Sequence, residues 1–307
     1  MAAFAHSAPC WVDVQLPDLE AGKRFYGELF GWTFRAGEEV DRGGPCVDAL
    51  SGGKLVAALA AKQDGRMPTA WGIYFATDDI AATVTRIRQA GGQVITEPVR
   101  MGGAGVLAQA ADPGGAVFGL WQAGDRGGFQ KQNEPGSFCW TEVYTRQKDR
   151  VDAFYEQVFG FRGTDLGAVG TDESGRGESG TGESGTGESE TPESETTDSE
   201  TPESGISESG ADVPGVDFRM WSPAGTEPGP DTAIGGRSVI TDAFPAEMPS
   251  YFLNYFAVAD CDATAETGAH LGGRVSVPPF DIPYGRMAVL HDNQGAEFAV
   301  LQPPVPR

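Results

Sequence analysis

The chain has 307 residues, enough for two ordinary domains, and 39% of them are hydrophobic, so each domain can bury a core. The formal net charge of −22 argues against a protein that grips DNA, RNA or anionic lipid, because those partners require clustered Lys and Arg. The charge is concentrated, since the segment 163–212 holds 14 of the 44 acidic residues and a single arginine.

The N-terminal segment MAAFAHSAPCW has no basic region followed by an apolar run, so no secretory signal peptide is predicted. No apolar run approaches the roughly 18 residues of a membrane-spanning helix. The cysteines are far apart and form no C-x-x-C pair, which indicates neither a zinc ribbon nor a dithiol redox site. These features favour a protein of the reducing cytoplasm with neither nucleic acid nor membrane as a partner.

The first predicted elements form a module at about 9–62. The stretch CWVDVQL alternates, as in a half-buried strand, and places three of its side chains on one face: Trp11, Asp13 and Gln15. Asp18 then caps the helix LEAGKRFYGELF, and Gly31 ends it. Three further strands are predicted, around 32–35, 45–50 and 54–60. The module is therefore a strand, a helix and three strands, or βαβββ.

A second βαβββ module is predicted at about 69–123. Its first strand is WGIYFAT, and the pair Asp78-Asp79 caps a helix that ends at Gly91-Gly92. Three strands follow, around 93–96, 106–111 and 116–122. The two modules together predict a first domain at 1–125.

The same pattern returns in the second half of the chain. Residues 10–31 match 139–160 at an offset of 129, and residues 74–98 match 255–279 at an offset of 181. A second domain is therefore predicted at 137–304, with modules at about 137–241 and 249–303, after a linker at 126–136. The growth of the offset requires an insertion between the two matches.

The insertion is the acidic tract at about 165–212, which consists mainly of Glu, Ser, Gly and Thr. Such a composition cannot bury enough apolar surface to offset the entropy of ordering, so a disordered loop is predicted. An interaction tail and a tolerated surface expansion both stay open as interpretations.

Four phrases make the chain resemble the vicinal oxygen chelate superfamily, which includes glyoxalase I, bleomycin-resistance proteins and extradiol dioxygenases. These phrases are DLEAGKRFYGELFGW, DAFYEQVFGF, ADPGGAVFGLWQ and HDNQGAEFAVLQP. The resemblance implies an α+β fold in which two modules pair their sheets into a cup, with helices outside and the ligand inside. The tandem arrangement is similar to actinobacterial proteins labelled hydroxylases or glyoxalase-like proteins.

Metal-dependent members of that superfamily place a His in the first strand of a module and a Glu in its last strand. In this chain the matching first-strand positions carry aromatic residues: Trp11, Trp71, Trp140 and Phe252. The matching last-strand positions carry Gly119 and Ala299. No metal and no cofactor are therefore expected.

The aromatic replacements suggest a site for an organic ligand. Trp11, Trp71 and Trp140 are expected to line the cups, where they either stack on a flat aromatic molecule or fill space that no longer holds a metal. Asp13 and Glu142 occupy equivalent cup-facing positions, where each is a candidate general base or ligand-binding carboxylate; a structural hydrogen bond or salt bridge is the alternative. Further polar candidates on the cup face are Gln15, Tyr144 and Asn254.

The remaining reactive side chains point to no further chemistry. Cys10 and Cys139 repeat, but alternation places both away from the cup, as small buried hydrophobes. The three histidines, His6, His270 and His291, do not cluster in sequence and are predicted to be solvated surface residues.

Three functions stay open at this point. The first is a metal-independent protein that binds a small hydrophobic or aromatic molecule in one or both cups. The second is an enzyme of the hydroxylase, lyase, isomerase or dioxygenase type that uses Asp13 or Glu142. The third is a structural role with degenerate cups. The sequence does not distinguish a monomer from a homodimer.

Overall fold

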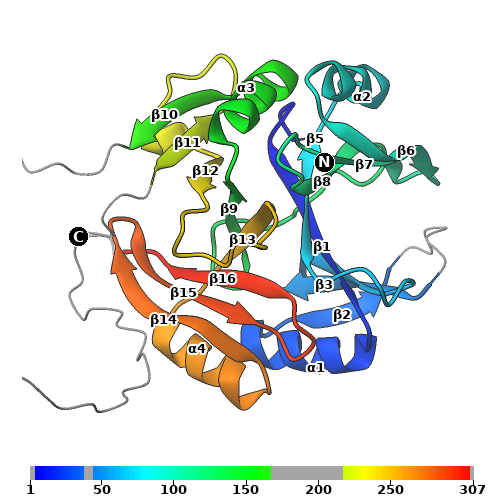
Figure 1. Cartoon of the computed structure of the whole chain (residues 1–307). Helices are drawn as coiled ribbons and strands as arrows, with labels where there is room; N and C mark the ends of the chain where they lie inside the picture. The colour runs from blue at the N-terminus through cyan, green and yellow to red at the C-terminus, as the bar shows by residue number, and fades with distance from the viewer. Residues whose placement is uncertain (1–3, 38–43, 167–216, 305–307) are drawn as a thin grey trace, which may run out of the picture.

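The computed structural model describes residues 4–37, 44–166 and 217–304. Within these ranges the chain forms two eight-stranded sheets, with four α-helices and one short 3-10 helix (Figure 1). The α+β class that the resemblance implies and the tandem arrangement of two modules per sheet that the repeats predict are both confirmed. The predicted acidic insert falls almost entirely on 167–216, outside the described residues.

The first sheet is built by strands between residues 9 and 123 in the order β2-β3-β4-β1-β5-β8-β7-β6. Its elements are β1 (Pro9–Leu16), α1 (Leu19–Phe30), β2 (Thr33–Ala36), β3 (Cys46–Ser51), β4 (Lys54–Ala61), β5 (Trp71–Ala76), α2 (Ile80–Gln89), β6 (Gln93–Met101), β7 (Gly105–Ala111) and β8 (Val117–Ala123). The two modules meet where β1 pairs antiparallel with β5. Each helix is a crossover, so β1 runs parallel to β4 and β5 runs parallel to β8.

The second sheet repeats this order as β10-β11-β12-β9-β13-β16-β15-β14. Its elements are β9 (Ser137–Thr145), α3 (Lys148–Phe159), β10 (Arg162–Leu166), β11 (Phe218–Ser222), η1 (Pro230–Thr232), β12 (Gly235–Val239), β13 (Tyr251–Ala257), α4 (Cys261–His270), β14 (Arg274–Ile282), β15 (Gly285–His291) and β16 (Glu297–Gln302). Here β9 and β13 form the antiparallel seam between modules.

The helix starts follow the capping chemistry that the sequence predicts. Asp18, Asp79 and Asp260 each accept a hydrogen bond of 2.9 Å from the backbone N–H three residues on. The N-cap of α3 is Gln147, whose side chain makes no cap bond. Of the predicted pair Asp78-Asp79, it is Asp79 that caps α2, and this choice of one residue matters for the site.

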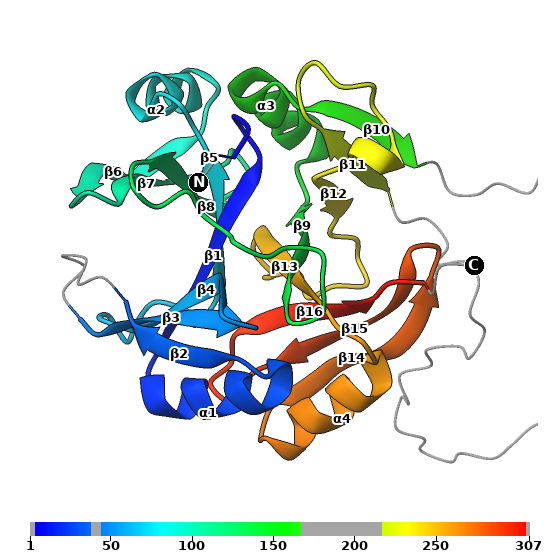
Figure 2. The same ribbon diagram turned by 180° about the vertical axis from the view of Figure 1, so that it is seen from behind.

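The main core lies between the two sheets, on the face of each sheet that carries the helices. It is one continuous cluster that joins residues of both halves, among them Val12, Phe25, Phe118, Phe154 and Phe256. In Figures 1 and 2 α1 lies beside α4 at one end of the molecule, and α2 lies beside α3 at the other. Each half of the chain therefore covers the helix face of the other.

Two equivalent buried hydrogen bonds connect the halves. Tyr26 of α1 donates to Asp292 at 2.8 Å, and Tyr155 of α3 donates to Asp112 at 3.2 Å. Both aspartates also organise their own turns by accepting backbone N–H groups at 2.8–3.0 Å. The turn of one half is thus fixed by a helix of the other.

Candidate functional site

The face of each sheet opposite the helices carries a second, smaller apolar cluster. On the first sheet this open face, here called cup 1, is formed by Trp11, Asp13, Tyr74, Met101 and Trp121 with their neighbours. On the second sheet the open face, cup 2, is formed by a corresponding set: Trp140, Glu142, Tyr144, Tyr255, Met287 and Val289. The predicted candidates Trp11, Asp13, Trp140, Glu142 and Tyr144 therefore lie on the cup faces, and Gln15 shares their phase in β1.

In cup 1 the buried carboxylate of Asp13 accepts a hydrogen bond of 2.9 Å from the Tyr74 hydroxyl. Gly72, directly opposite on β5, has no side chain, and a Cβ there would stand 2.9 Å from an Asp13 oxygen. A second buried acid, Asp48, lies in the same row of the sheet across β4, because Asp48 pairs with Ala58 and Ala58 pairs with Asp13. Asp48 forms ion pairs with Arg35 and Arg126 at 3.1 and 2.8 Å.

In cup 2 the equivalent acid is longer and has different partners. Glu142 accepts hydrogen bonds from the Trp140 indole at 2.9 Å and from the Ser238 hydroxyl at 3.3 Å. Burial raises the pKa of the Glu142 carboxyl, and hydrogen bonds from Trp140, Tyr255, Tyr144 and Ser238 act against that rise. The site is therefore a buried carboxylate surrounded by neutral donors, and none of its partners among the described residues is a cation.

Aromatic rings cover this carboxylate. Tyr144 stacks on Tyr251 with ring centroids 5.1 Å apart, and Phe244 meets Tyr144 edge-on at 6.1 Å. Burial and the charge of Glu142 together raise the pKa of both Tyr144 and Tyr255, so their hydroxyls remain protonated donors. Trp140, Tyr144 and Tyr251 pack against the cup 2 cluster and are only partly buried.

A second polar cluster lies on the open face of the strands β14–β16. The Ser276 hydroxyl is 2.7 Å from His291 Nδ1, Arg274 Nη2 is 3.1 Å from both ring nitrogens, and Glu297 Oε1 is 3.7 Å from His291 Nε2. Burial and then Arg274 lower the pKa of His291, while burial raises the pKa of Glu297. The prediction that His291 is a solvated turn residue is wrong, because it is the last residue of β15 and is half-buried.

Two predicted cup residues lie on the other side of their sheets. Trp71 is buried in the helix-face core, where its indole donates to the Tyr26 hydroxyl at 3.0 Å. Asn254 is fully buried between the sheets, accepting from Thr141 at 2.9 Å and donating to the Trp71 carbonyl at 3.3 Å. The predicted pair Asp78-Asp79 left the cap of α2 undecided by one residue, and the matching of 74–98 with 255–279 carried the same uncertainty to the strand of Asn254. A one-residue slip moves a strand residue to the opposite face. The cup positions are Gly72 and Leu253.

The prediction that Cys10 and Cys139 point away from the cups is also wrong. The pairing of β1 with β5 shifts between Pro9 and Trp11, and that of β13 with β9 shifts between Tyr255 and Phe256, so each cysteine sits at a β-bulge. Cys10 belongs to the cup 1 cluster and Cys139 packs against the cup 2 cluster. Burial raises the pKa of the Cys139 thiol to about 12 and that of Cys10 further, which leaves both thiols protonated.

Comparison with known proteins agrees with this geometry. The family model described as the Glyoxalase/Bleomycin resistance protein/Dioxygenase superfamily matches residues 9–120 and 136–300. The chain belongs to this superfamily. It is similar to the putative glyoxylase CFP32 of Mycobacterium tuberculosis, with 34% identity covering 98% of this chain and 96% of that protein. It is also similar to the anthracycline biosynthesis protein DnrV of Streptomyces peucetius, with 33% identity covering 98% and 95% of the two chains.

Solved structures of the superfamily share the fold at low identity. The 2,3-dioxygenase LapB of Pseudomonas sp. KL28 aligns with a TM-score of 0.57 and 12% identity, covering 98% of this chain and 95% of that one. The Mn(II)-bound glyoxalase of Novosphingobium aromaticivorans aligns with a TM-score of 0.55 and 13% identity, covering 97% and 83%.

The metal of such relatives does not fit the residues present here. The cup positions of the first strands hold Trp11, Gly72, Trp140 and Leu253, and those of the last strands hold Gly119 and Ala299. None of these side chains offers the imidazole or carboxylate ligands that such a metal takes. In the described ranges no three His, Cys, Asp or Glu side chains gather in a way that could hold an ion.

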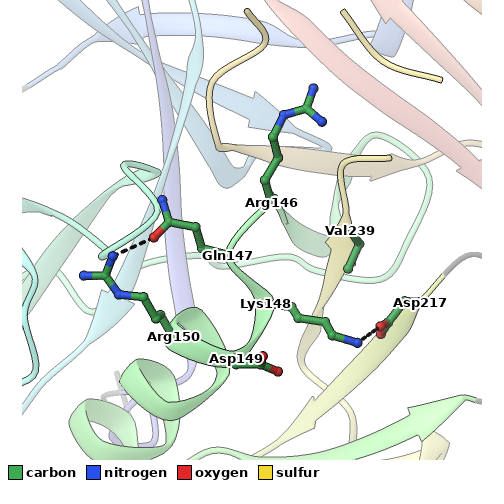
Figure 3. A pocket seen from close by; sticks show the side chains of 7 residues that line it. All are labelled: Arg146, Gln147, Lys148, Asp149, Arg150, Asp217 and Val239. Atoms are coloured by element: carbon green, nitrogen blue, oxygen red, sulfur yellow. Dashed lines mark hydrogen bonds and ion pairs between the residues drawn. The ribbon is translucent and has the colours of Figure 1, made fainter. Parts of the chain in front are cut away.

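A surface pocket of about 420 Å³ lies outside both cups, at the start of α3. Figure 3 shows its lining, with Lys148 paired to Asp217 and Arg150 donating to Gln147. None of the predicted site residues lines it. No helix among the described residues is long and apolar enough to cross a membrane.

Proposed function

We propose that cup 2 binds a flat aromatic molecule that carries a hydroxyl group, and that it does so without a metal. The observation that carries this proposal is the pairing of a buried carboxylate, Glu142, with the partly buried aromatic residues Trp140, Tyr144 and Tyr251. The rings offer faces for stacking. The carboxylate offers an acceptor for a ligand hydroxyl.

The relatives support the same ligand class. Two of them are named anthracycline biosynthesis proteins, and an anthracycline is a fused-ring aromatic compound with phenolic hydroxyls. Metal independence is supported by the residues at the ligand positions, because indole, glycine and leucine supply no metal donor.

A catalytic use of Glu142 is the second candidate, and the raised pKa of its carboxyl favours it. A carboxylate with a raised pKa is a stronger base than an ordinary glutamate, so it can accept the proton of a bound phenol or of a carbon acid. Asp13 is the other candidate for this role, as the equivalent acid of cup 1, and its carboxylate accepts from the Tyr74 hydroxyl.

The test uses alizarin, a planar dihydroxyanthraquinone, titrated into the full chain and followed by its visible absorbance. We expect saturable binding that weakens about fivefold in Tyr144→Ala, since one aromatic stacking contact contributes about 1 kcal/mol. The matched control is Gln15→Ala, the residue at the same position in cup 1. Absence of saturable binding, or an equal loss in both variants, would contradict the proposal.

Two further arms separate the parts of the proposal. Dialysis against EDTA, with elemental mass spectrometry before and after, should leave alizarin binding unchanged; a loss that added metal restores would overturn metal independence. Slow conversion of alizarin by the wild type, lost in Glu142→Gln while binding persists, would favour the catalytic alternative.

A further inference from the structure

Arg126 reaches from the linker back over cup 1. The backbone that carries it is fixed, because Gly124 and Arg126 donate to the Ala104 carbonyl at 2.8 and 3.2 Å. The Trp121 indole donates to the Arg126 carbonyl at 2.9 Å. The side chain is therefore directed onto the open face of the first sheet by ordered main-chain contacts.

The guanidinium of Arg126 meets two recognition groups at once. Its central carbon lies 4.4 Å from the centroid of the Trp11 ring, and Nη2 donates to Asp48 Oδ1 at 2.8 Å. Asp48 is buried, with 5% of its side chain exposed. An aromatic face beside a buried carboxylate is the arrangement by which proteins recognise organic cations.

Cup 2 lacks this arrangement. The position equivalent to Asp48 holds Met220, because Met220 pairs with Gly236 and Gly236 pairs with Glu142. The Trp140 indole is used to donate to Glu142. The combination of a tryptophan face with a buried acid at the position of Asp48 therefore occurs in cup 1 and not in cup 2. Cup 2 is thus a natural comparison for cup 1 within the same chain.

We propose that Trp11 and Asp48 form a binding site for a guanidinium group, and that Arg126 occupies this site in cis. A small guanidinium-bearing molecule competes with Arg126 for the same ring and carboxylate. The tethered side chain has a high effective concentration, so it keeps cup 1 closed to external cations in the wild-type chain. This inference does not depend on the function proposed for cup 2.

The test is the binding of methylguanidinium to Arg126→Ala, measured by calorimetry on the full chain at low salt. The variant should fold, because Arg35 still pairs with the second oxygen of Asp48 at 3.1 Å. We expect saturable binding with a Kd of about 1–10 mM, in the range of an isolated ion pair with one ring contact. The wild type should bind at least about tenfold more weakly.

Four controls define the site. Arg126→Ala combined with Asp48→Asn should lose the binding, and Arg126→Lys should exclude the probe because an ammonium group remains in place. N-methylurea, which is similar in shape but uncharged, should not bind. Arg88→Ala, which removes an exposed arginine paired with Glu97, should behave like the wild type.

The proposal is overturned if Arg126→Ala binds no methylguanidinium, binds N-methylurea equally well, or binds no better than the wild type. Should Arg126→Ala fail to fold, Arg126→Gln preserves the length of the side chain and removes its charge, and the same outcomes apply to it.

Discussion

The two cups occupy equivalent positions in a repeated fold, yet each satisfies its buried acid with different hydrogen-bond donors. Both place an acid on the first strand, Asp13 or Glu142, and a tyrosine on the neighbouring strand opposite the tryptophan two residues before that acid. In cup 1 Asp13 accepts a hydrogen bond from the hydroxyl of Tyr74. In cup 2 the longer Glu142 accepts a hydrogen bond from the indole of Trp140 on its own strand. Equivalent positions in a repeat therefore do not imply equivalent sites.

The outer strands differ in the same direction. The positions that hold His291, Ser276 and Glu297 in the second sheet hold apolar residues in the first: Ala111, Ile95 and Val117. Cup 1 concentrates its charge near the linker, around Asp48 and Arg126. In cup 2 the polar side chains extend along the open face of the sheet, from Glu142 on β9 to the cluster around His291 on β14–β16.

The largest expected effect comes from Gly119, which lies under Tyr74 where cup 2 has Ala299 under Tyr255. A Cβ at Gly119 would come within 2.0 Å of the Tyr74 ring. Gly119→Ala should therefore displace Tyr74 from Asp13 and lower the free energy of unfolding by about 2–3 kcal/mol. Ala299→Gly should cost only about 1 kcal/mol. Urea unfolding of both variants is the measurement; equal losses would show that the two tyrosines are placed alike.

Changing Trp11 and changing Trp140 should lower the stability by amounts that differ less than those of the previous pair. Trp140→Phe removes a hydrogen bond to a buried carboxylate and should cost about 1 kcal/mol more than Trp11→Phe, which only weakens a cation–π contact. The comparison cancels most of the lost ring area, since both changes remove the same atoms. Chemical denaturation of both variants at low salt measures the two losses. A larger loss for Trp11→Phe would contradict the role given to the hydrogen bond between Trp140 and Glu142.

Glu142→Gln should change the pH dependence of stability. Because burial raises the pKa of Glu142, the folded chain holds this proton at a pH where the unfolded chain has lost it. Wild-type stability should therefore fall as pH rises from the ordinary Glu value of about 4.3 through the raised pKa, and the Gln variant should lack this decline. Urea midpoints across that pH range give the slope. A difference that stays constant with pH would mean that the pKa of Glu142 is not raised.

The smallest expected difference between the cups concerns the cysteine at the β-bulge of each one, Cys10 in cup 1 and Cys139 in cup 2. Cys10 is buried, Cys139 is partly buried, and burial raises the pKa of both thiols, so neither should react with iodoacetamide in the folded chain at neutral pH. Both should react fully in urea. Peptide mapping reads the two sites separately, and native labelling of one alone would reveal a cup that opens.

Much of the fold could be predicted from sequence because it rests on local rules repeated four times. The caps at Asp18 and Asp260, the left-handed glycines Gly31 and Gly160, and the alternation of β1 all report short-range chemistry. These signals define the modules, and the matching of modules defines the two sheets.

The site was less predictable because it depends on registers and contacts that local patterns do not encode. The sequence did not decide between Asp78 and Asp79 as the cap of α2, and a slip of one residue there and in the matching strand placed Trp71 and Asn254 on the wrong face. A β-bulge does the same for Cys10, since alternation assumes an unbroken ladder. Arg126 and Asp48 are 78 residues apart, and the linker has no second copy to compare. No repeat signal marks that pair.

The hydrogen bond from Tyr26 to Asp292 has a consequence for synthesis on the ribosome. Its partners are 266 residues apart, which at about 5–20 residues per second is a delay of roughly 13–50 seconds. In the later part of that time, once β8 has been made, the nascent first half has its own strands complete, but α1 still lacks its contact with α4. The second half of the chain therefore covers the apolar surface of the first half only after its own synthesis, so the first half has to remain unaggregated until then.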